Sequence, residues 1–421
     1  MLHRLCCYTA IVLVSDTLII NPHAELKTTQ DGDQVTAITV LAPIKGEHLR
    51  VTTVARNDNP SLFSLLLLHS MIHDATGASG FGTDERTQLA EIGLLVPEDR
   101  VSTRPWFSCD LEDLPREFLP RGERRAPRAT APDDLVVNPT LQLFGRDGFP
   151  ESMRGRLHPK NRFNPDRSWL WVDTGELSGP SIYSYSTAVA DVVDGLNPGE
   201  PPPSSLDPEF RQNLFEAGVI VSSSAMARRR EARHAQTAAA GPLLRQRGFL
   251  VLPQLVPPMQ LAAVRRYYRE LIAEGFLPEG DNKDRPNRDY SGRDPIAHFY
   301  HQQLADLTAG IAGEPLQPSF CYFASYRAGS VLPAHLDRPQ CEYAISIQLD
   351  FSPDPETVSP WALYAEPLDG SPAEPIELPL GGALPYFGCR VRHYREVLTQ
   401  GDYSRHWFVF YVPLTFTEAL D

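Results

Sequence analysis

The fold of this chain is decided by residues 326–337, which read YRAGSVLPAHLD. A short apolar run, a glycine turn and a second extended run lead into His335 and Asp337. On extended backbone, residues two apart project to the same side of a strand, so this imidazole and this carboxylate can bind one metal ion. The chain contains 12 histidines, and a His-x-Asp pair arises about once by chance at ordinary aspartate frequency. The surrounding sequence therefore has to support the assignment.

The sequence around this pair predicts an antiparallel β domain. Strand signals separated by glycine or proline extend over 320–326, 343–349, 361–365, 383–387 and 406–412. Such a series is typical of a small sandwich or barrel. A short strand at 248–253 and a helix that begins at Pro258 precede it. We therefore predict a mixed α+β domain over 241–421.

This segment resembles the catalytic core of Fe(II)- and 2-oxoglutarate-dependent dioxygenases, especially the prolyl 4-hydroxylase-like branch. That family places a tyrosine and a glycine before His-x-Asp, a glycine-led strand before a distal histidine, and a later glycine before an arginine. The matching positions here are Tyr326, Gly329, His335, Asp337, Gly382, His393, Gly401 and Arg405. The motifs cover about the last hundred residues. The resemblance implies a double-stranded β-helix (jelly-roll or cupin-like) fold in which His335, Asp337 and His393 bind Fe(II) and form the catalytic centre.

The expected cosubstrate site follows from the same resemblance. Two imidazoles and one carboxylate leave three positions of Fe(II) open, which suits bidentate 2-oxoglutarate plus oxygen. The distal carboxylate needs a permanent cation, and a guanidinium binds it through two parallel hydrogen bonds. Arg405 is the expected residue and Arg395 the alternative. In the family the arginine commonly follows its glycine by two residues, where this chain has Tyr403.

Other positions qualify the match. Leu332 aligns with a family tyrosine that often contacts 2-oxoglutarate, so another residue has to supply that hydrogen bond. The candidates for cosubstrate contact are Tyr326, Tyr322 and Tyr386. His406 competes with His393 for the role of distal ligand. Related halogenases replace the carboxylate of Asp337 by a small residue, so its presence here favours hydroxylation of an unactivated C–H bond, with ascorbate as an optional further cofactor.

The first half of the chain contains a candidate internal repeat. SDTLIINP at 15–22 matches PDDLVVNP at 132–139, and LAEIGLLV at 89–96 matches LFEAGVIV at 214–221. The first pair predicts a turn, a buried strand and an Asn-Pro turn, and the second a helix that ends at glycine before an apolar strand. The order and separations are similar, so we predict two mixed α/β copies at 1–120 and 121–235. Chance similarity of short apolar patterns is the alternative.

The remaining segments are read as connections and core. Residues 120–132 are charged and rich in proline and mark a boundary between the copies, whereas 222–240 predict an exposed connecting helix. His69 and His73 follow a run of leucines, which indicates a core helix more than a ligand pair. The apolar stretch 5–14 is too short to span a bilayer and is expected to be a buried strand.

The composition excludes several functions. A net charge of −14 opposes a nucleic-acid partner, because nucleic-acid binders collect basic residues into a patch. The six cysteines lack the paired spacing of a zinc site or a disulfide framework, which fits a reducing cytoplasm. No membrane segment is expected, and nothing in the sequence defines the oligomeric state.

The sequence leaves several hypotheses open for the substrate. The polar segment 279–295 is either a lid over the iron site or a solvated loop, and His298 and His301 follow on a helix that can face the site. The N-terminal half shows no catalytic pattern, so we expect it to recognise a macromolecular substrate or to mediate assembly. A hydroxylase of a peptide or protein side chain is therefore the first hypothesis. A hydroxylase of a small metabolite and a non-catalytic binding or scaffold protein with a degenerate oxygenase fold are the alternatives.

Overall fold

The computed structural model of this 421-residue chain describes residues 18–32, 34–71, 81–115, 134–145, 163–164, 166–277, 287–292 and 294–420. The chain divides into two compact units, Met1–Arg104 with Glu270–Pro278 and Pro105–Arg269 with Glu279–Asp421. The predicted strand at 5–14, the predicted boundary at 120–132, His73 and the side chain of His69 lie outside the described residues.

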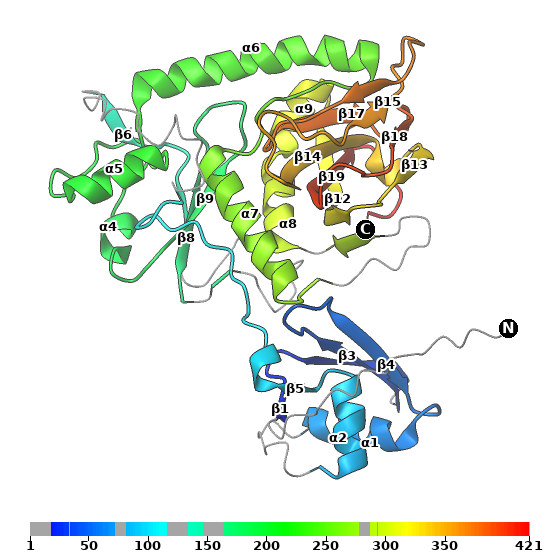
Figure 1. The fold of residues 1–421 in the computed structure, drawn as a ribbon. Coiled ribbons are helices and arrows are strands. Elements are labelled where there is room, and N and C mark those ends of the chain that lie inside the picture. The colour runs from blue at the N-terminus through cyan, green and yellow to red at the C-terminus, as the bar shows by residue number, and fades with distance from the viewer. Residues whose placement is uncertain are drawn as a thin grey trace. The chain divides into compact units, whose positions relative to one another are not determined.

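The described residues of the first unit form a three-stranded meander, a strand pair and two α-helices (Figure 1). Its elements are β1 (Leu18–Ile20), β2 (Glu25–Asp31), β3 (Gln34–Ala42), β4 (Arg50–Ala55), α1 (Pro60–Met71), α2 (Thr83–Glu91) and β5 (Leu95–Pro97). Strands β2, β3 and β4 are antiparallel neighbours, and β1 pairs with β5. Its core includes Ile38, Val40, Leu66 and Leu89, which are almost fully buried.

The second unit begins with a segment of the same element order. Its elements are β6 (Leu135–Val137), β7 (Gln142–Gly145), β8 (Ser168–Val172), β9 (Ser181–Tyr185), α4 (Ala190–Asp194), α5 (Pro208–Glu216) and β10 (Ile220–Ser222). Strands β7, β8 and β9 form a meander, and β6 pairs antiparallel with β10, just as β1 pairs with β5. Residues 105–115, which the sequence placed in the first copy, belong to this second unit, where Asp110 bridges to Ser184 of β9.

One hydrogen-bond arrangement occurs in both segments. Asn21 and Asn138 follow the first strand of each segment, and each side-chain amide donates to two backbone carbonyls. The acceptors are Pro43 and Gly93 for Asn21, and Asp173 and Gly218 for Asn138. Gly93 and Gly218 both have positive φ, 80° and 73°, where other residues are strained. These equivalences support the duplication, and the copy boundaries at 1–120 and 121–235 remain a proposal.

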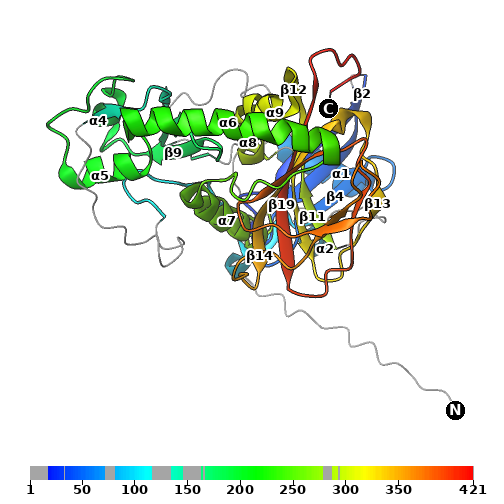
Figure 2. The same cartoon turned by 90° about the horizontal axis from the view of Figure 1, so that it is seen from above.

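A long helix, α6 (Ser223–Arg247), connects this segment to the C-terminal part (Figure 2). The hydroxyl of Ser222 accepts from the amide of Ala225 at the start, and Gly248 ends the helix in the left-handed conformation. The predicted connecting helix is therefore present but longer, because it passes through Pro242 without ending there. The predicted strand at 248–253 forms only two isolated bridges, Phe249 to Tyr386 and Leu252 to Ala383.

The described residues of the C-terminal part form two antiparallel sheets and three α-helices. The helices are α7 (Pro258–Ala273), α8 (Pro295–Gln303) and α9 (Ala305–Ala312). The strands of the five-stranded sheet, in spatial order, are β11 (Arg288–Ser291), β12 (Leu316–Arg327), β19 (Tyr403–Pro413), β14 (Tyr343–Ser352) and β17 (Ala383–Phe387). The four-stranded sheet contains β13 (Leu332–His335), β18 (His393–Arg395), β15 (Leu363–Ala365) and β16 (Glu374–Ile376). The predicted mixture of helices with antiparallel sheets is confirmed.

The five-stranded sheet has two different faces. Helices α7 and α8 pack on one face, here called the helix-covered face (Figure 1), where Tyr268 stacks on Phe323 and receives a hydrogen bond from Trp407 Nε1. The opposite, inner face is turned toward the four-stranded sheet, and the rings of Tyr386 and His393 meet there at 4.8 Å between centroids. Because side chains alternate along a strand, neighbouring residues of β12 and β19 divide between these two environments.

Among the described residues, no helix combines the length and the apolar character that a membrane span requires. The described cysteines Cys109, Cys321, Cys341 and Cys389 form no disulfide bond with one another.

Candidate metal centre

The pairing of two short strands brings two histidines together. His335 ends β13, His393 begins β18, and the two are cross-strand partners with ring centroids 4.4 Å apart. Asp337 follows β13 by two residues, and its backbone amide donates to the carbonyl of Gly388 at 2.9 Å. The carboxylate is therefore held beside both imidazoles by the backbone itself.

The three side chains have the spacing of metal ligands. Oδ1 of Asp337 lies 3.5 Å from Nε2 of His335 and 3.8 Å from Nε2 of His393. One ligand atom from each residue lies within 4.8 Å of the others. Ligands about 2.0–2.2 Å from a shared metal are separated by distances of this size. The structure thus brings together the three residues that the sequence singled out as ligands.

Both imidazoles are oriented for metal binding. Nδ1 of His335 lies 2.8 Å from the carbonyl oxygen of Pro333, and Nδ1 of His393 lies 3.0 Å from that of Val391. A carbonyl only accepts, so Nδ1 carries the proton and Nε2 keeps the lone pair that binds a metal. Burial lowers the pKa of His393 below its ordinary value, against the opposing charge of Asp337, and so favours the neutral ring that a metal needs.

Tyr386 and Gly388 position the carboxylate. The hydroxyl of Tyr386 donates to Oδ2 of Asp337 at 3.2 Å, which leaves Oδ1 facing the histidines. Burial, together with the negative charge of Asp337, raises the pKa of Tyr386 well above 10, so the hydroxyl remains a donor. A Cβ on Gly388 would lie 2.6 Å from Oδ2 of Asp337 and 2.2 Å from the carbonyl oxygen of Cys341. Tyr386 therefore orients a ligand, and Gly388 is a site residue that the motif comparison did not single out.

Arg395 lies beside the three ligands. It follows His393 by two residues on β18, so both side chains project to the same side of the strand. Arg395 is 3% exposed, its guanidinium stacks 4.6 Å over the ring of Trp361, and Nη1 donates to the Trp361 carbonyl. Among the described residues its Nε has no hydrogen-bond partner. Burial lowers the pKa of Arg395 to about 10, so the side chain is still a cation at neutral pH.

Arg405 lies elsewhere, on the helix-covered face. Its Nη1 donates to Oδ2 of Asp350 at 3.0 Å and its Nε to the hydroxyl of Ser325 at 3.3 Å. Asp350 also receives hydrogen bonds from Arg265 and Arg269 of α7. Burial acts to raise the pKa of Asp350, but these arginines outweigh it and hold the pKa below its usual value. The structure therefore places Arg405 in an ion-pair network and does not bring it to the three ligands.

His406 and Tyr326 occupy the inner face without joining the ligands. His406 is fully buried, and its Nε2 lies 2.9 Å from the hydroxyl of Ser404. Burial, and then the charge of Arg395, lower the pKa of His406 well below its ordinary value. Tyr326 packs against Trp361 and His406, with centroids 5.1 and 5.9 Å apart. His406 thus lines the inner face, while His393 stands in the group of three.

A second arginine lines the inner face beyond Tyr326. Arg288 of β11 is the cross-strand partner of Tyr326, and its guanidinium lies 5.9 Å from that ring and 5.4 Å from the ring of Tyr290. Tyr290 in turn lies 5.1 Å from Tyr322. Arg288 is 7% exposed, and no described residue hydrogen-bonds its Nε or Nη1. Nothing in the local sequence separated Arg288 from the polar residues around it.

The segment 279–295 is only partly the loop or lid that was expected. Residues 279–286 lie outside the described residues, residues 288–291 form the edge strand β11, and Pro295 begins α8. His298 and His301 do lie on the predicted helix. They gather with Cys321 in a separate group, not with His335, Asp337 and His393.

Two hollows of the second unit, of about 390 and 630 Å³, lie away from this group of three. The lining of the first includes Phe351, Asp354 and Gly401, and the second is lined by residues around β10 and the start of α6. Neither lining contains His335, Asp337 or His393. The candidate site is therefore identified by the chemistry of its side chains.

Comparison with known proteins gives matches at the level of structure. No family model and no curated protein matches the sequence. Similar solved structures include the non-heme alpha-ketoglutarate-dependent carbocyclase SnoK from nogalamycin biosynthesis (15% identity, 41% of this chain and 82% of that chain, TM-score 0.35). A prolyl-4-hydroxylase from Pseudomonas putida shares 19% identity over 41% of this chain and 98% of that chain, with a TM-score of 0.34. HygX from Streptomyces hygroscopicus, solved with nickel, 2-oxoglutarate and hygromycin B, shares 13% identity over 42% of this chain and 87% of that chain, with a TM-score of 0.34.

The position of Arg405 predicts a structural role. Replacing Arg405 by Met removes one cation from the buried Asp350 while both arginines of α7 remain. We expect the free energy of unfolding to fall by about 2 kcal/mol. Removing one partner of an isolated buried ion pair costs more, about 3–5 kcal/mol, because the remaining charge then has no partner. Chemical denaturation measures the change.

The matched control is Arg392→Met. Arg392 is 57% exposed and lies 3.9 Å from Glu366, so its loss should change the free energy by less than about 1 kcal/mol. Equal stability of the two variants would contradict the structural role of Arg405.

Proposed function

We propose that this protein is an Fe(II)- and 2-oxoglutarate-dependent dioxygenase that hydroxylates an unactivated C–H bond. The observation that carries the proposal is the convergence of His335, Asp337 and His393, with both Nε2 atoms turned toward Oδ1 of the carboxylate. Two imidazoles and one carboxylate on one side of a metal are the donor set of non-haem iron oxygenases, and they leave adjacent coordination positions open. In this proposal the five- and four-stranded sheets are the two halves of a double-stranded β-helix.

The same proposal assigns 2-oxoglutarate to Arg395 instead of Arg405. Bound Fe(II) supplies the position at which the keto acid and oxygen meet and the keto acid is oxidised to succinate and carbon dioxide. His393 and Arg395 point to the same side of β18, with backbone positions about 7 Å apart. A diacid held at its keto end beside His393 therefore presents its other carboxylate to the guanidinium.

Charge supports Arg395 for this role. The guanidinium is a buried cation that stacks on Trp361 and retains a free donor at Nε among the described residues. A buried charge without an ionic partner is costly, and an anionic ligand offsets that cost. Arg405 already has Asp350 as its partner. The Nδ1 atom of His406, which no described residue hydrogen-bonds, lies on the same inner face.

Aromatic side chains complete the site. Tyr322 stacks on Phe408 at 4.8 Å, and Tyr326 packs against Trp361. These rings are buried and cover the inner face of the sheet beside the ligands. An apolar lining excludes water, which strengthens the interactions of the cosubstrate with Arg395 and limits oxidation of the keto acid without substrate.

Our first hypothesis for the substrate remains a peptide or protein side chain, recognised with the help of the N-terminal region. In the described part of the chain, both groups of potential metal ligands lie C-terminal to residue 295. The described N-terminal elements therefore offer no metal centre, and recognition is the role proposed for them.

A second candidate, a small acidic metabolite, is favoured by Arg288. This guanidinium lies 5.9 Å from the ring of Tyr326, whose charge also acts on Arg395. One arginine suffices for the distal carboxylate of 2-oxoglutarate. Arg288 would then be available to bind an acidic group of the substrate, because no described residue hydrogen-bonds its Nε or Nη1.

The metal assignment predicts loss of turnover in three variants. We expect His335→Ala, Asp337→Ala and His393→Ala each to lower Fe(II)-dependent conversion of 2-oxoglutarate to succinate by more than about 100-fold, because each removes a ligand. His234→Ala is the control, since His234 is exposed on α6. If two of the three variants kept the turnover of the unchanged protein, His335, Asp337 and His393 would not form the metal centre.

The cosubstrate assignment predicts a difference between two arginines. Arg395→Met should weaken the binding of 2-oxoglutarate by about 10- to 100-fold, because charge-assisted hydrogen bonds contribute about 1.5–3 kcal/mol. Arg405→Met should leave this affinity unchanged at a temperature where the variant is folded. Calorimetric titration with Mn(II) in place of iron measures both. The reverse result would return the cosubstrate to Arg405.

The acidic-substrate candidate predicts which compounds stimulate turnover. In a panel of small carboxylic acids and their neutral amides, we expect only acids to stimulate succinate formation. Arg288→Met should raise at least about 10-fold the concentration of a stimulating acid that gives half-maximal turnover, as loss of a charged hydrogen bond does. The concentration of the keto acid cosubstrate needed for half-maximal turnover should not change. This candidate would be ruled out if only the amides stimulated turnover. It would also be ruled out if Arg288→Met changed the half-maximal concentration of the keto acid cosubstrate and not that of the stimulating acid.

A further inference from the structure

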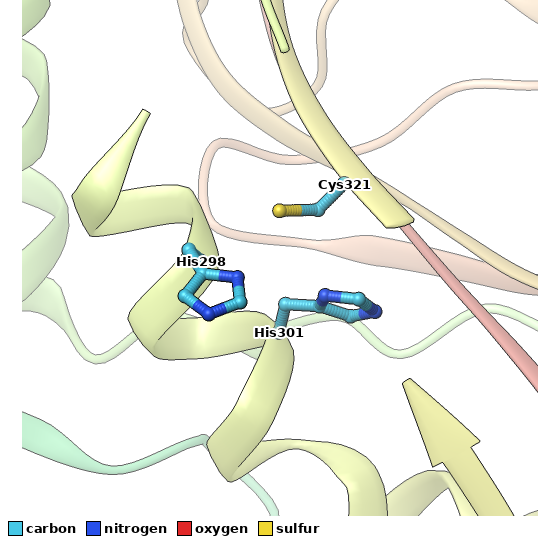
Figure 3. A group of neighbouring side chains, drawn as sticks. All are labelled: His298, His301 and Cys321. Atoms are coloured by element: carbon cyan, nitrogen blue, oxygen red, sulfur yellow. The ribbon is translucent and has the colours of Figure 1, made fainter. Parts of the chain in front are cut away.

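We propose that His298, His301 and Cys321 form a second metal site, for zinc, on the helix-covered face of the five-stranded sheet. One ligand atom of each residue lies within 4.8 Å of the others. All three are buried, with exposed fractions of 8%, 1% and 6%. Figure 3 shows the two imidazoles on one helix next to the thiol on the neighbouring strand. This proposal does not depend on the oxygenase proposal.

The helix presents both histidines on one side. His298 and His301 are three residues apart on α8, a spacing that places side chains next to each other on a helix. The start of α8 is firmly held, because Asp294 accepts hydrogen bonds from the amides of Ile296 and Ala297 and from the buried hydroxyl of Tyr268. The position of the two imidazoles is therefore set before any ligand binds.

Strand alternation turns the thiol of Cys321 toward the two histidines. The pairing of β12 with β19 shifts register between Pro318 and Cys321, and such bulges redirect side chains. Cys321 precedes Phe323 by two residues, and Phe323 contacts α7 on the helix-covered face. By alternation Cys321 points to the same face, toward α8.

The second nitrogen of His301 is already fixed. Its Nε2 lies 2.7 Å from the carbonyl oxygen of Phe410, so this nitrogen carries the proton and Nδ1 keeps the lone pair. The ring also packs against Tyr411 at 5.0 Å, and the Tyr411 hydroxyl donates to the carbonyl of His301 at 2.8 Å. A metal-bound histidine typically donates its other ring N–H to a carbonyl in this way.

The donor set selects zinc over iron. Two imidazoles and a thiolate suit a borderline-soft cation such as Zn²⁺, and a tetrahedral zinc takes these three with one further ligand such as water. The group of His335, Asp337 and His393 has a carboxylate and no thiol, which suits Fe(II). The two groups lie on opposite faces of the same sheet, so their metals would not share a ligand.

The proposed zinc has a structural consequence. It links α8 to β12 of the five-stranded sheet, and the opposite face of that sheet contacts His393 of the four-stranded sheet through Tyr386. Metal binding to a folded site adds its binding free energy to the stability of the fold. We therefore expect zinc to stabilise the domain without entering the reaction.

Cobalt substitution of the full-length protein tests the proposal. We use the His393→Ala background, so that the first group does not compete, and add Co(II) to the metal-free protein. A thiolate bound to cobalt gives an intense near-ultraviolet charge-transfer band, and we expect this band to saturate at about one equivalent. Cys321→Ser should abolish the band. The matched control is Cys389→Ser, because Cys389 is a partly exposed thiol outside the group, and it should retain the band.

A second measurement tests the proposal even if the Cys321→Ser variant does not fold. Metal analysis of the same His393→Ala protein, purified without added metal, should give about one zinc per chain, and removal of that zinc should lower Tm. Absence of both the cobalt band and bound zinc would show that these side chains are ordinary core packing and would overturn the proposal. A cobalt band that persists in Cys321→Ser would overturn it equally.

Discussion

The antiparallel pairing of β13 with β18 is the constraint on which the candidate centre depends. It makes His335 and His393 cross-strand partners, and it places Asp337 where its amide meets the carbonyl of Gly388. Each imidazole then donates Nδ1–H to a carbonyl only two residues away in sequence, so the strands themselves set the tautomer. A one-residue slip between these strands would turn one imidazole away from the carboxylate.

The buried arginines of the C-terminal part fall into two groups that differ in charge compensation. On the helix-covered face Arg405 forms an ion pair with Asp350. Arg265 and Arg269 of α7 also pair with this carboxylate. Near Tyr326, Arg395 of β18 and Arg288 of β11 are buried side chains with donors that no described residue fills. A buried cation without an ionic partner is costly, and an anionic ligand would offset that cost. We propose that this difference in charge compensation distinguishes the structural Arg405 from the ligand-binding candidates Arg395 and Arg288.

Much of this arrangement could be read from local sequence. Strand alternation predicted that His335 and Asp337 project to the same side of the backbone. The similar helix-glycine-strand patterns predicted two equivalent segments, which contain Asn21 and Asn138. The face on which Arg405 lies depends on the register of β19, which its pairing with Asp350 reveals and the spacing after Gly401 does not. Arg288 was missed for a similar reason, since β11 joins the sheet only through tertiary pairing with β12.

His335, Asp337 and His393 would leave three positions of a bound Fe(II) open, two of them for a bidentate keto acid and one for oxygen. Anaerobic addition of 2-oxoglutarate to the Fe(II)-loaded protein tests this most directly, because a chelated keto acid on iron(II) gives a visible charge-transfer absorption. We expect this absorption to grow with 2-oxoglutarate and to saturate at about one equivalent of the chelate per chain. A protein that binds Fe(II) but develops no such absorption would contradict the proposed centre.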